Sequence, residues 1–324
     1  MYLLLIGGRQ KRKLIRTDDD EHRFDAAMIV SLDTDSLCSQ ILVEYKCPLS
    51  ACADSEASSL FTSGTLRGDK LFVCTYTEAL IYQLPTFTLI TRISLPCFNS
   101  LHHVCPTNDD HLLVANTGLD MVVEIATDGT IVREWSATAE KPWTRFSRGI
   151  DYRRVASTKP HLSHPNFIFQ LGKDIWVTRF WQRDALCLTD DYRRIDIAIE
   201  RVHDGVLSNE RLYFTTVDGH LLIFDALSLR QIAVIDLKAA SGAAMRPGWC
   251  RGVMVVDEHR VWVGFTRIRK PAVMDKVMWV KHGFRQAESP THISLYDVAV
   301  GRCLQEIPLE DMGINILFGV LPAR

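Results

Sequence analysis

Short apolar runs separated by polar turn residues recur along the whole chain. The clearest unit spans residues 100–135, where four β-rich runs are separated by turns at 107–110, 116–118 and 128–129. The last of these turns is Asp-Gly, which is a strong hairpin signal between two such runs. Four short antiparallel strands in about forty residues match one blade of a β-propeller. They also match an ordinary meander in a β-sandwich, so only repetition of the unit can distinguish the two folds.

Similar units follow one another through the chain. The centres of their second strands are Val73, Val114, Val177, Phe214 and Val263. A sixth unit is split between the chain ends, because Ile314–Leu321 is an inner strand without a partner and Met1–Ile6 is a second strand without a first. Joining the two removes the exposed sheet edges that an open array would carry. The pattern therefore predicts an all-β, six-bladed β-propeller over residues 1–324, with blade one closed by the N- and C-terminal strands.

Composition narrows the class of protein. The 324 residues are 47% hydrophobic, which suffices for a large core, and the net charge of −2 does not indicate nucleic-acid binding. No apolar run approaches the roughly 18 residues of a transmembrane helix, and the N-terminus does not read as a signal peptide, so no membrane association is expected. Nine scattered cysteines without a CxxC pair favour free thiols and a reducing, cytoplasmic location.

Three long insertions interrupt the repeat, at residues 9–25, 137–164 and 266–290. Each enters a first strand or joins a second strand to a third, so all three are predicted on one face, where loops of a rigid scaffold usually bind ligands. The second and third are rich in Arg and Lys. A cleft lined with arginine attracts carboxylate or phosphate groups, which predicts a covered pocket for a small anionic molecule. The alternative is that these residues pair with acids on other loops.

Polar residues at the predicted channel mouth are the candidate functional residues. Five histidines fall at that level, at positions 102, 103, 161, 164 and 203. The candidate catalytic residues are His103, His164, His203 and Asp204. The candidate substrate-binding residues are Asn116, Asp120, Lys159, His161, Arg179, Trp181, Arg183, Arg251 and Arg267. Imidazoles that converge on the axis could bind a divalent metal, for which His103, Asn166 and His203 are the candidate ligands. For each residue singly, a hydrogen-bonded structural role, a turn or rim packing is the alternative.

The stretch from His111 to Trp135 resembles a blade of the six-bladed propeller enzymes and NHL-type repeats. In pattern it is similar to the gluconolactonase/regucalcin and strictosidine-synthase-like propellers, which implies the architecture. The gluconolactonase family holds a divalent metal on the channel axis with a Glu, Asn residues and an Asp at the starts of inner strands. Asn166 and Asp204 are of those residue types at such positions, whereas the first inner strand has no matching Glu.

Two functions from different classes follow. The first is an enzyme that acts on a small carboxylate, phosphate or sugar acid, with hydrolase or lactonase chemistry implied by resemblance and lyase or isomerase chemistry left open. The second is a non-catalytic propeller that binds a protein or a glycan. Propeller folds serve both purposes, so the fold does not decide between them.

Overall fold

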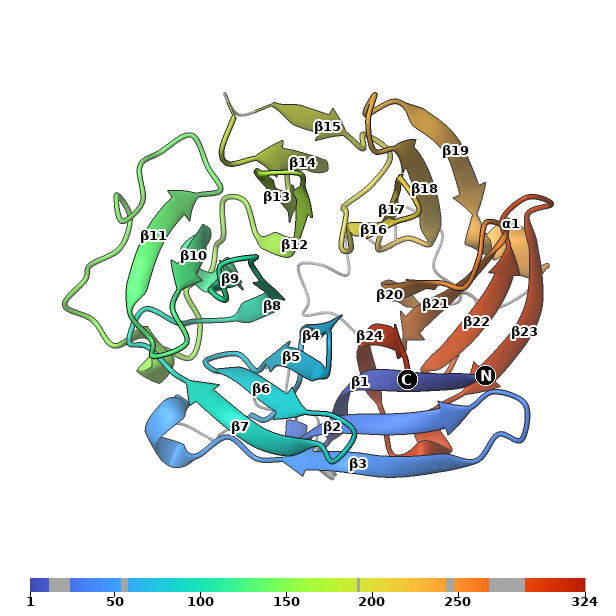
Figure 1. The fold of residues 1–324 in the computed structure, drawn as a ribbon, viewed down its shortest axis with the longest axis horizontal. Helices are drawn as coiled ribbons and strands as arrows, with labels where there is room; N and C mark the ends of the chain where they lie inside the picture. The colour runs from blue at the N-terminus through green and yellow to red at the C-terminus, as the bar shows by residue number, and fades with distance from the viewer. Residues whose placement is uncertain (12–23, 54–57, 191–192, 243–247, 268–288, 324) are drawn as a thin grey trace.

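Six four-stranded antiparallel sheets form a ring in the computed structural model (Figure 1). This arrangement confirms the six-bladed propeller. The structure describes residues 1–11, 24–53, 58–190, 193–242, 248–267 and 289–323. Most of the predicted insertions 9–25 and 266–290 lies outside these residues. Within them, no helix is long and apolar enough to cross a membrane, and each of the nine cysteines is a free thiol.

In each blade the first strand named lies next to the channel, and the others follow outward (Figure 1). Blade one contains β24 (Ile316–Pro322), β1 (Tyr2–Gln10), β2 (Phe24–Asp33) and β3 (Ser39–Tyr45). Blade two contains β4 (Ser63–Arg67), β5 (Lys70–Cys74), β6 (Ala79–Gln83) and β7 (Thr88–Ile93). Blade three contains β8 (Leu101–Pro106), β9 (Leu112–Asn116), β10 (Met121–Ile125) and β11 (Ile131–Ser136).

The second half of the ring follows the same order. Blade four contains β12 (Pro165–Leu171), β13 (Asp174–Arg179), β14 (Asp184–Cys187) and β15 (Arg194–Asp196). Blade five contains β16 (Val206–Ser208), β17 (Arg211–Thr215), β18 (His220–Asp225) and β19 (Gln231–Asp236). Blade six contains β20 (Trp249–Val255), β21 (Arg260–Thr266), β22 (His292–Asp297) and β23 (Arg302–Pro308), and the short helix α1 (Leu237–Ser241) precedes it.

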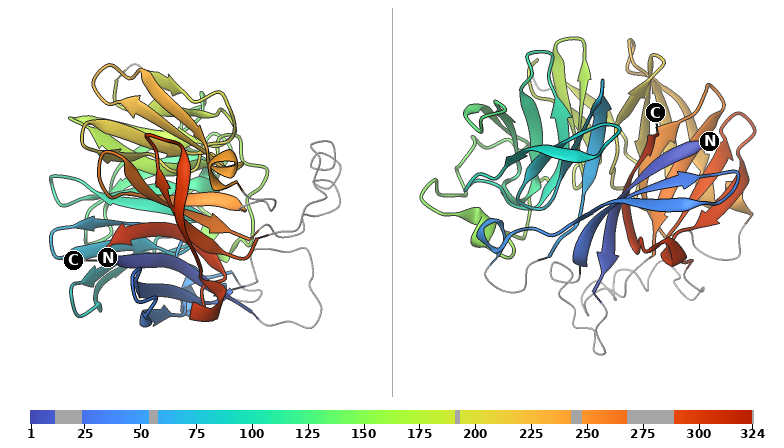
Figure 2. Two further views of the ribbon diagram at one scale, coloured as in Figure 1. Left: turned by 90° about the vertical axis from the view of Figure 1, so that its right-hand side faces the viewer. Right: turned by 60° about the horizontal axis from the view of Figure 1, so that its bottom comes forward.

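The two chain ends close the ring as predicted. Strand β1 pairs with β24 in antiparallel register, with Leu5 opposite Val320 and Gly7 opposite Leu317. The strands approach so closely that a Cβ atom on Gly7 would lie 1.9 Å from the carbonyl oxygen of Ile316. Gly7 therefore permits the backbone contact that joins the two ends. The termini lie side by side in two views (Figures 1 and 2).

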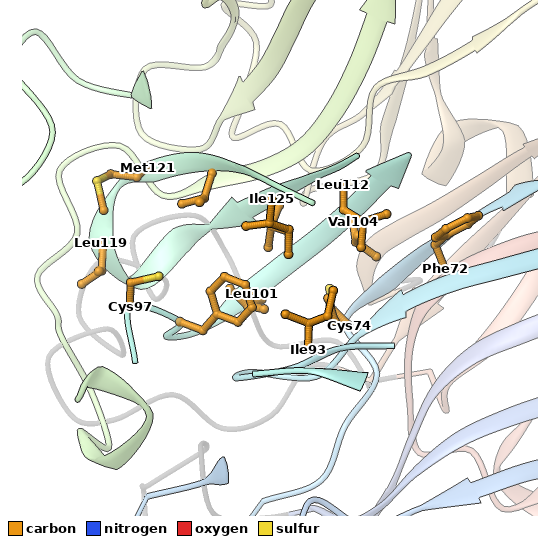
Figure 3. Close-up of a cluster of buried hydrophobic side chains, with 14 of the residues drawn as sticks. Phe72, Cys74, Ile93, Cys97, Leu101, Val104, Leu112, Leu119, Met121 and Ile125 are labelled. Carbon is orange, nitrogen blue, oxygen red and sulfur yellow. The ribbon is translucent and has the colours of Figure 1, made fainter. Parts of the chain in front are cut away.

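Apolar residues fill the spaces between neighbouring blades. The cluster between blades two and three includes Phe72, Leu101, Val104 and Leu112, all buried (Figure 3). Alternate residues of a strand point to opposite faces, so each blade contributes apolar side chains to both of its neighbours. Full burial of one such side chain stabilises the fold by about 1.5–3 kcal/mol. The blades are thus held as a rigid ring around the channel.

The insertion 137–164 is well described and folds against blade three. Its short 3-10 helix spans Tyr152–Arg154. The Tyr152 ring is buried, and its backbone N–H donates to the carbonyl of Pro96 at 2.7 Å. The chain then runs to the start of β12, at the channel. The insertion therefore delivers its last residues to the ends of the inner strands.

Candidate functional site

Four imidazole rings gather at one end of the channel, and we call them the imidazole cluster. His102 belongs to β8, His161 and His164 end the 137–164 insertion just before β12, and His203 precedes β16. The ring centroids of His102 lie 4.8 Å from those of His164 and 6.4 Å from those of His203. The His161 and His164 centroids are 5.0 Å apart. Three blades thus contribute rings to one cluster.

Aromatic rings and one arginine surround the imidazole cluster. Phe318 of β24 lies 6.3 Å from His102 and 5.7 Å from His203, between ring centroids. The guanidinium carbon of Arg251, on β20, lies 4.3 Å from the centroid of the Phe318 ring. The charge of Arg251 lowers the pKa of both His102 and His203. Arg251 is therefore the cation that acts on the cluster from blade six.

Hydrogen bonds assign the proton on each ring of the His161–His164 pair. The hydroxyl of Thr158 faces two acceptors, the carbonyl of Gly118 at 2.5 Å and Oδ1 of Asn99 at 3.2 Å. Its single proton goes to one of them, so it accepts from Nε2–H of His161 at 3.3 Å. Nδ1 of a neutral His161 is then an acceptor, and Nδ1–H of His164 donates to it at 2.8 Å. His164 is left with an unprotonated Nε2.

His102 and His203 also carry their proton on Nδ1 and leave Nε2 unprotonated, through different contacts. Nδ1–H of His102 donates to the carbonyl of Ser100 at 2.9 Å. Nδ1–H of His203 donates to Oδ1 of Asp204 at 3.3 Å, and Asp204 is itself held by the backbone N–H of Gly252 at 2.8 Å and by the hydroxyl of Thr215. Among the described residues, Nε2 of His203 is buried and has no hydrogen-bond partner.

Burial is the main cause of the low basicity of the cluster. It lowers the pKa of His102 and His164 well below 6.5, it lowers that of His203, and it lowers that of His161 to about 4. Neighbouring imidazoles lower the pKa of His164 further. The four rings are therefore neutral near pH 7, and three of them carry an unprotonated Nε2.

His103 lies beside this cluster without joining it. Its Nδ1 accepts from the backbone N–H of Ile168 at 3.1 Å, and its Nε2–H donates to Oγ1 of Thr65 at 3.1 Å. The ring stacks on Phe167 with centroids 3.8 Å apart, and burial lowers its pKa to about 3. His103 thus ties blades two, three and four together through both nitrogens.

One of the three predicted metal ligands, His103, has no free ring nitrogen, whereas Oδ1 of Asn166 and Nε2 of His203 have no hydrogen-bond partner among the described residues. Both nitrogens of His103 are engaged, and the side-chain N–H of Asn166 donates to the carbonyl of Val202 at 3.0 Å. In the part of the chain that the structure describes, no group of three or more His, Cys, Asp or Glu side chains could hold a metal. Metal binding stays a prediction from the sequence.

Three residues predicted to bind substrate make structural contacts. The carboxylate of Asp120 accepts the backbone N–H groups of Leu162, Ser163 and His164 at 2.8–2.9 Å, and pairs with Arg145 at 2.8 Å. Asp120 thereby fixes the end of the insertion and the position of His164.

Arg179 and Asn116 are buried in similar roles. Arg179 forms a two-pronged ion pair with Asp184, at 2.7 and 2.5 Å, and also donates to the carbonyl of Ala137 at 3.0 Å. The Asn116 side chain bridges the carbonyl of Cys97 and the backbone N–H of Asn99, at 2.8 and 3.0 Å. Each of these contacts holds a loop at the channel end of the blades.

The remaining predicted residues lie at the rim. The Trp181 side chain is 50% exposed, with the Arg201 guanidinium 5.0 Å from its ring centroid. Arg183 lies 3.8 Å from Glu200, and Arg267 pairs with Glu310 at 2.6 Å. Lys159 is exposed. For Arg183 and Arg267, pairing with an acid is what the structure shows.

A small pocket lies among loops of blades two and three and the 137–164 insertion. Its lining includes Ser58, Tyr76, Ser100 and Arg153. Ser100 is also the residue whose carbonyl accepts from His102. Tyr76 packs against the apolar group that contains Phe318. None of the four rings of the imidazole cluster lines this pocket.

Sequence reasoning placed His102 in the histidine group but chose His103 as the functional residue. Successive residues of a strand point to opposite faces, so only one of the two could face the other imidazoles. The register of β8 on β9 shifts between Leu101 and His103, so a bulge at His102 interrupts the alternation and the sequence could not show which ring met the channel. Phe318 was missed, because nothing in an apolar strand marks one aromatic residue as a neighbour of histidines.

Comparisons with known proteins support the architecture alone. No protein-family model matches the chain, and no curated protein matches it. A protein of unknown function from Bacteroides caccae has a similar structure, with a TM-score of 0.63 and 12% identity over 100% of this chain and 99% of that one. A chain of a nidogen/laminin complex has a TM-score of 0.58 and 9% identity, over 99% of this chain and 97% of that one. Virginiamycin B lyase from Staphylococcus aureus has a TM-score of 0.46 and 12% identity, over 76% of this chain and 69% of that one.

Proposed function

We propose that this protein is an enzyme that acts on a small anionic molecule at the imidazole cluster. In this proposal Arg251 holds the anionic group, and His203 with Asp204 acts as the general base. One observation carries the proposal: Nε2 of His203 is buried without a partner, while its Nδ1–H is held by a carboxylate. A neutral imidazole oriented in this way is suited to remove a proton from a bound molecule.

The chemistry that this pair supports is proton transfer. His203 is neutral near pH 7, because burial lowers its pKa, and it can therefore take a proton at Nε2. Asp204 then stabilises the imidazolium that forms. The proton can come from a water, which gives hydrolysis of an ester or lactone, or from a carbon next to a carboxylate, which gives lyase or isomerase chemistry. Arg251 would stabilise negative charge that develops on the substrate.

Anion binding tests the first half of the proposal. Binding of small carboxylates and phosphates would be measured by ligand-observed NMR for the unmodified protein, Arg251→Gln and Arg302→Gln. The second variant is the matched control, because Arg302 is an exposed arginine on the outer strand β23. We expect binding to be lost only in Arg251→Gln. Equal binding in all three proteins would contradict the role of Arg251.

Turnover tests the second half. The anions that bind would be incubated with the protein and their products detected by NMR. His203→Asn should abolish turnover and retain anion binding, because Asn cannot accept a proton at neutral pH. Turnover that survives in His203→Asn would refute the general base.

A protein-binding scaffold is the second candidate function. Trp181 favours it, because a half-exposed tryptophan stacked with Arg201 has the composition of an interface hot spot. The nidogen/laminin structure contains a propeller of similar fold in a complex with a protein, although that likeness concerns the fold alone. Capture of a protein by the unmodified chain and not by Trp181→Ala, without any turnover, would favour this candidate.

A further inference from the structure

We propose that the site selects anions that also carry a hydrogen-bond donor, such as a hydroxyl or amino group beside the carboxylate or phosphate. This inference rests on the proposed anion site and adds the class of ligand to it. It follows from the hydrogen-bonding state of four side-chain atoms, Nε2 of His102, His164 and His203 and Oδ1 of Asn166, which are all acceptors. A ligand that brings only acceptors would leave them unsatisfied.

The acceptors come from three blades. Nε2 of His203 and Oδ1 of Asn166 are buried and have no hydrogen-bond partner among the described residues. The Asn166 amide is oriented by its N–H, which donates to the carbonyl of Val202, so its oxygen remains an acceptor. His102 and His164 each use Nδ1–H in a hydrogen bond, which leaves Nε2 of each as a further acceptor.

These acceptors cannot satisfy one another. Nitrogen and oxygen lone pairs repel when no proton lies between them, and the rings are neutral, so no second proton is available near pH 7. A buried polar group without a partner is unfavourable and is a common basis of specificity. Sites that pair with a substrate hydroxyl discriminate strongly against the analogue that lacks it. The cluster therefore favours a donor on the ligand.

Thr158 is the positioning residue for this acceptor set. Its hydroxyl gives its own proton to Gly118 or Asn99 and so obliges His161 to donate at Nε2. If His161 donated to His164 at Nδ1 instead of accepting from it, the proton of His164 would lie on Nε2, and that acceptor would become a donor. Thr158→Val removes the acceptor for Nε2–H of His161. We then expect the proton of His164 to be no longer fixed on Nδ1.

Two matched ligand pairs test the selectivity. Lactate carries one hydroxyl group that propionate lacks. Glycerol 3-phosphate carries two hydroxyl groups that propyl phosphate lacks. We expect the hydroxylated member of at least one pair to bind about tenfold or more tightly, measured by ligand-observed NMR competition. His102→Phe keeps a ring and removes its acceptor nitrogen, so the ratio should fall. His259→Gln, at an exposed position, should leave it unchanged.

Equal affinity within both pairs would overturn the selectivity and leave the anion site standing. Binding of neither member of either pair would overturn both proposals. Imidazole ¹⁵N NMR provides a readout without ligand: His164 should carry its proton on Nδ1, and Thr158→Val should change this. A proton on Nε2 of His164 in the unmodified protein would contradict the acceptor set, even where a variant fails to fold.

Discussion

Mild acid should destabilise this protein, because histidines that the fold keeps neutral gain protons when the chain unfolds. Burial lowers the pKa of His102, His103, His161, His164 and His203, to about 3 for His103 and about 4 for His161. The unfolded chain has ordinary histidines, with a pKa of about 6.5. Between the two values the unfolded state binds more protons than the folded state. The stabilisation is therefore complete above about pH 7 and is lost as pH falls.

The size of the effect follows from the linkage between protonation and folding. At pH 5.5 an unfolded histidine is mostly protonated while a buried one is still neutral, which costs about 1.4 kcal/mol for each residue. For His103 and His161, whose pKa values are about 3 and about 4, the two contributions sum to about 2.5 kcal/mol between pH 7 and 5.5. His102, His164, His203 and His292, whose pKa values burial also lowers, add to the loss in the same direction. A domain has about 5–15 kcal/mol of stability in total. His220 acts in the opposite direction, because Asp218 raises its pKa.

Urea unfolding at pH 7.5, 6.5 and 5.5, followed by tryptophan fluorescence, measures this loss. His103→Gln should lower the free energy of unfolding at pH 7.5 and reduce the loss on acidification by about 1.4 kcal/mol. His259→Gln is the matched control and should not change the pH dependence, because His259 is exposed. A loss smaller than about 2 kcal/mol between pH 7.5 and 5.5 would refute the view that these histidines are neutral and buried.

Three substitutions test the contacts that hold the site. Arg179→Met removes the two-pronged partner of the buried Asp184 carboxylate and leaves it only Arg194 at 3.9 Å, so it should lower the free energy of unfolding by about 3–5 kcal/mol in urea titrations; a loss below about 1 kcal/mol would contradict the burial of this pair. Asp120→Ala removes the acceptor for three backbone N–H groups, so limited proteolysis should cut the 137–164 insertion faster, and an unchanged rate would show that other contacts hold it. Gly7→Ala places a Cβ against the backbone of β24 and should lower stability by about 1–3 kcal/mol; an unchanged midpoint of urea unfolding would show that the closure of the ring can shift.

The fold could be predicted because its signal is periodic and local. Each blade repeats short apolar strands with turns at fixed places, such as Asp128-Gly129 between β10 and β11. The predicted second-strand centres Val73, Val114, Val177, Phe214 and Val263 each lie in the second strand of a blade. The split blade followed from two unpaired strands, Met1–Ile6 and Ile314–Leu321, which could satisfy their edges only with each other.

The site could be predicted only in part, because the sequence does not show which residues a charged side chain pairs with in the fold. Arg179 looked available for an anion, yet Asp184, five residues later, takes both prongs of its guanidinium. Asp120 looked like a ligand contact and instead holds the backbone of the insertion. The gathering of histidines was predictable from blade topology. Which nitrogen of each ring is left open depends on contacts such as Thr158 with His161, which only the structure shows.

Imidazole ¹⁵N NMR during addition of lactate or glycerol 3-phosphate tests the central claim most directly. If the cluster with Arg251 is the ligand site, Nε2 of His102, His164 and His203 should shift as the ligand binds, with one affinity, and the shifts should vanish in Arg251→Gln. The exposed His259 should not shift. Binding of either anion with these three resonances unmoved would contradict the account.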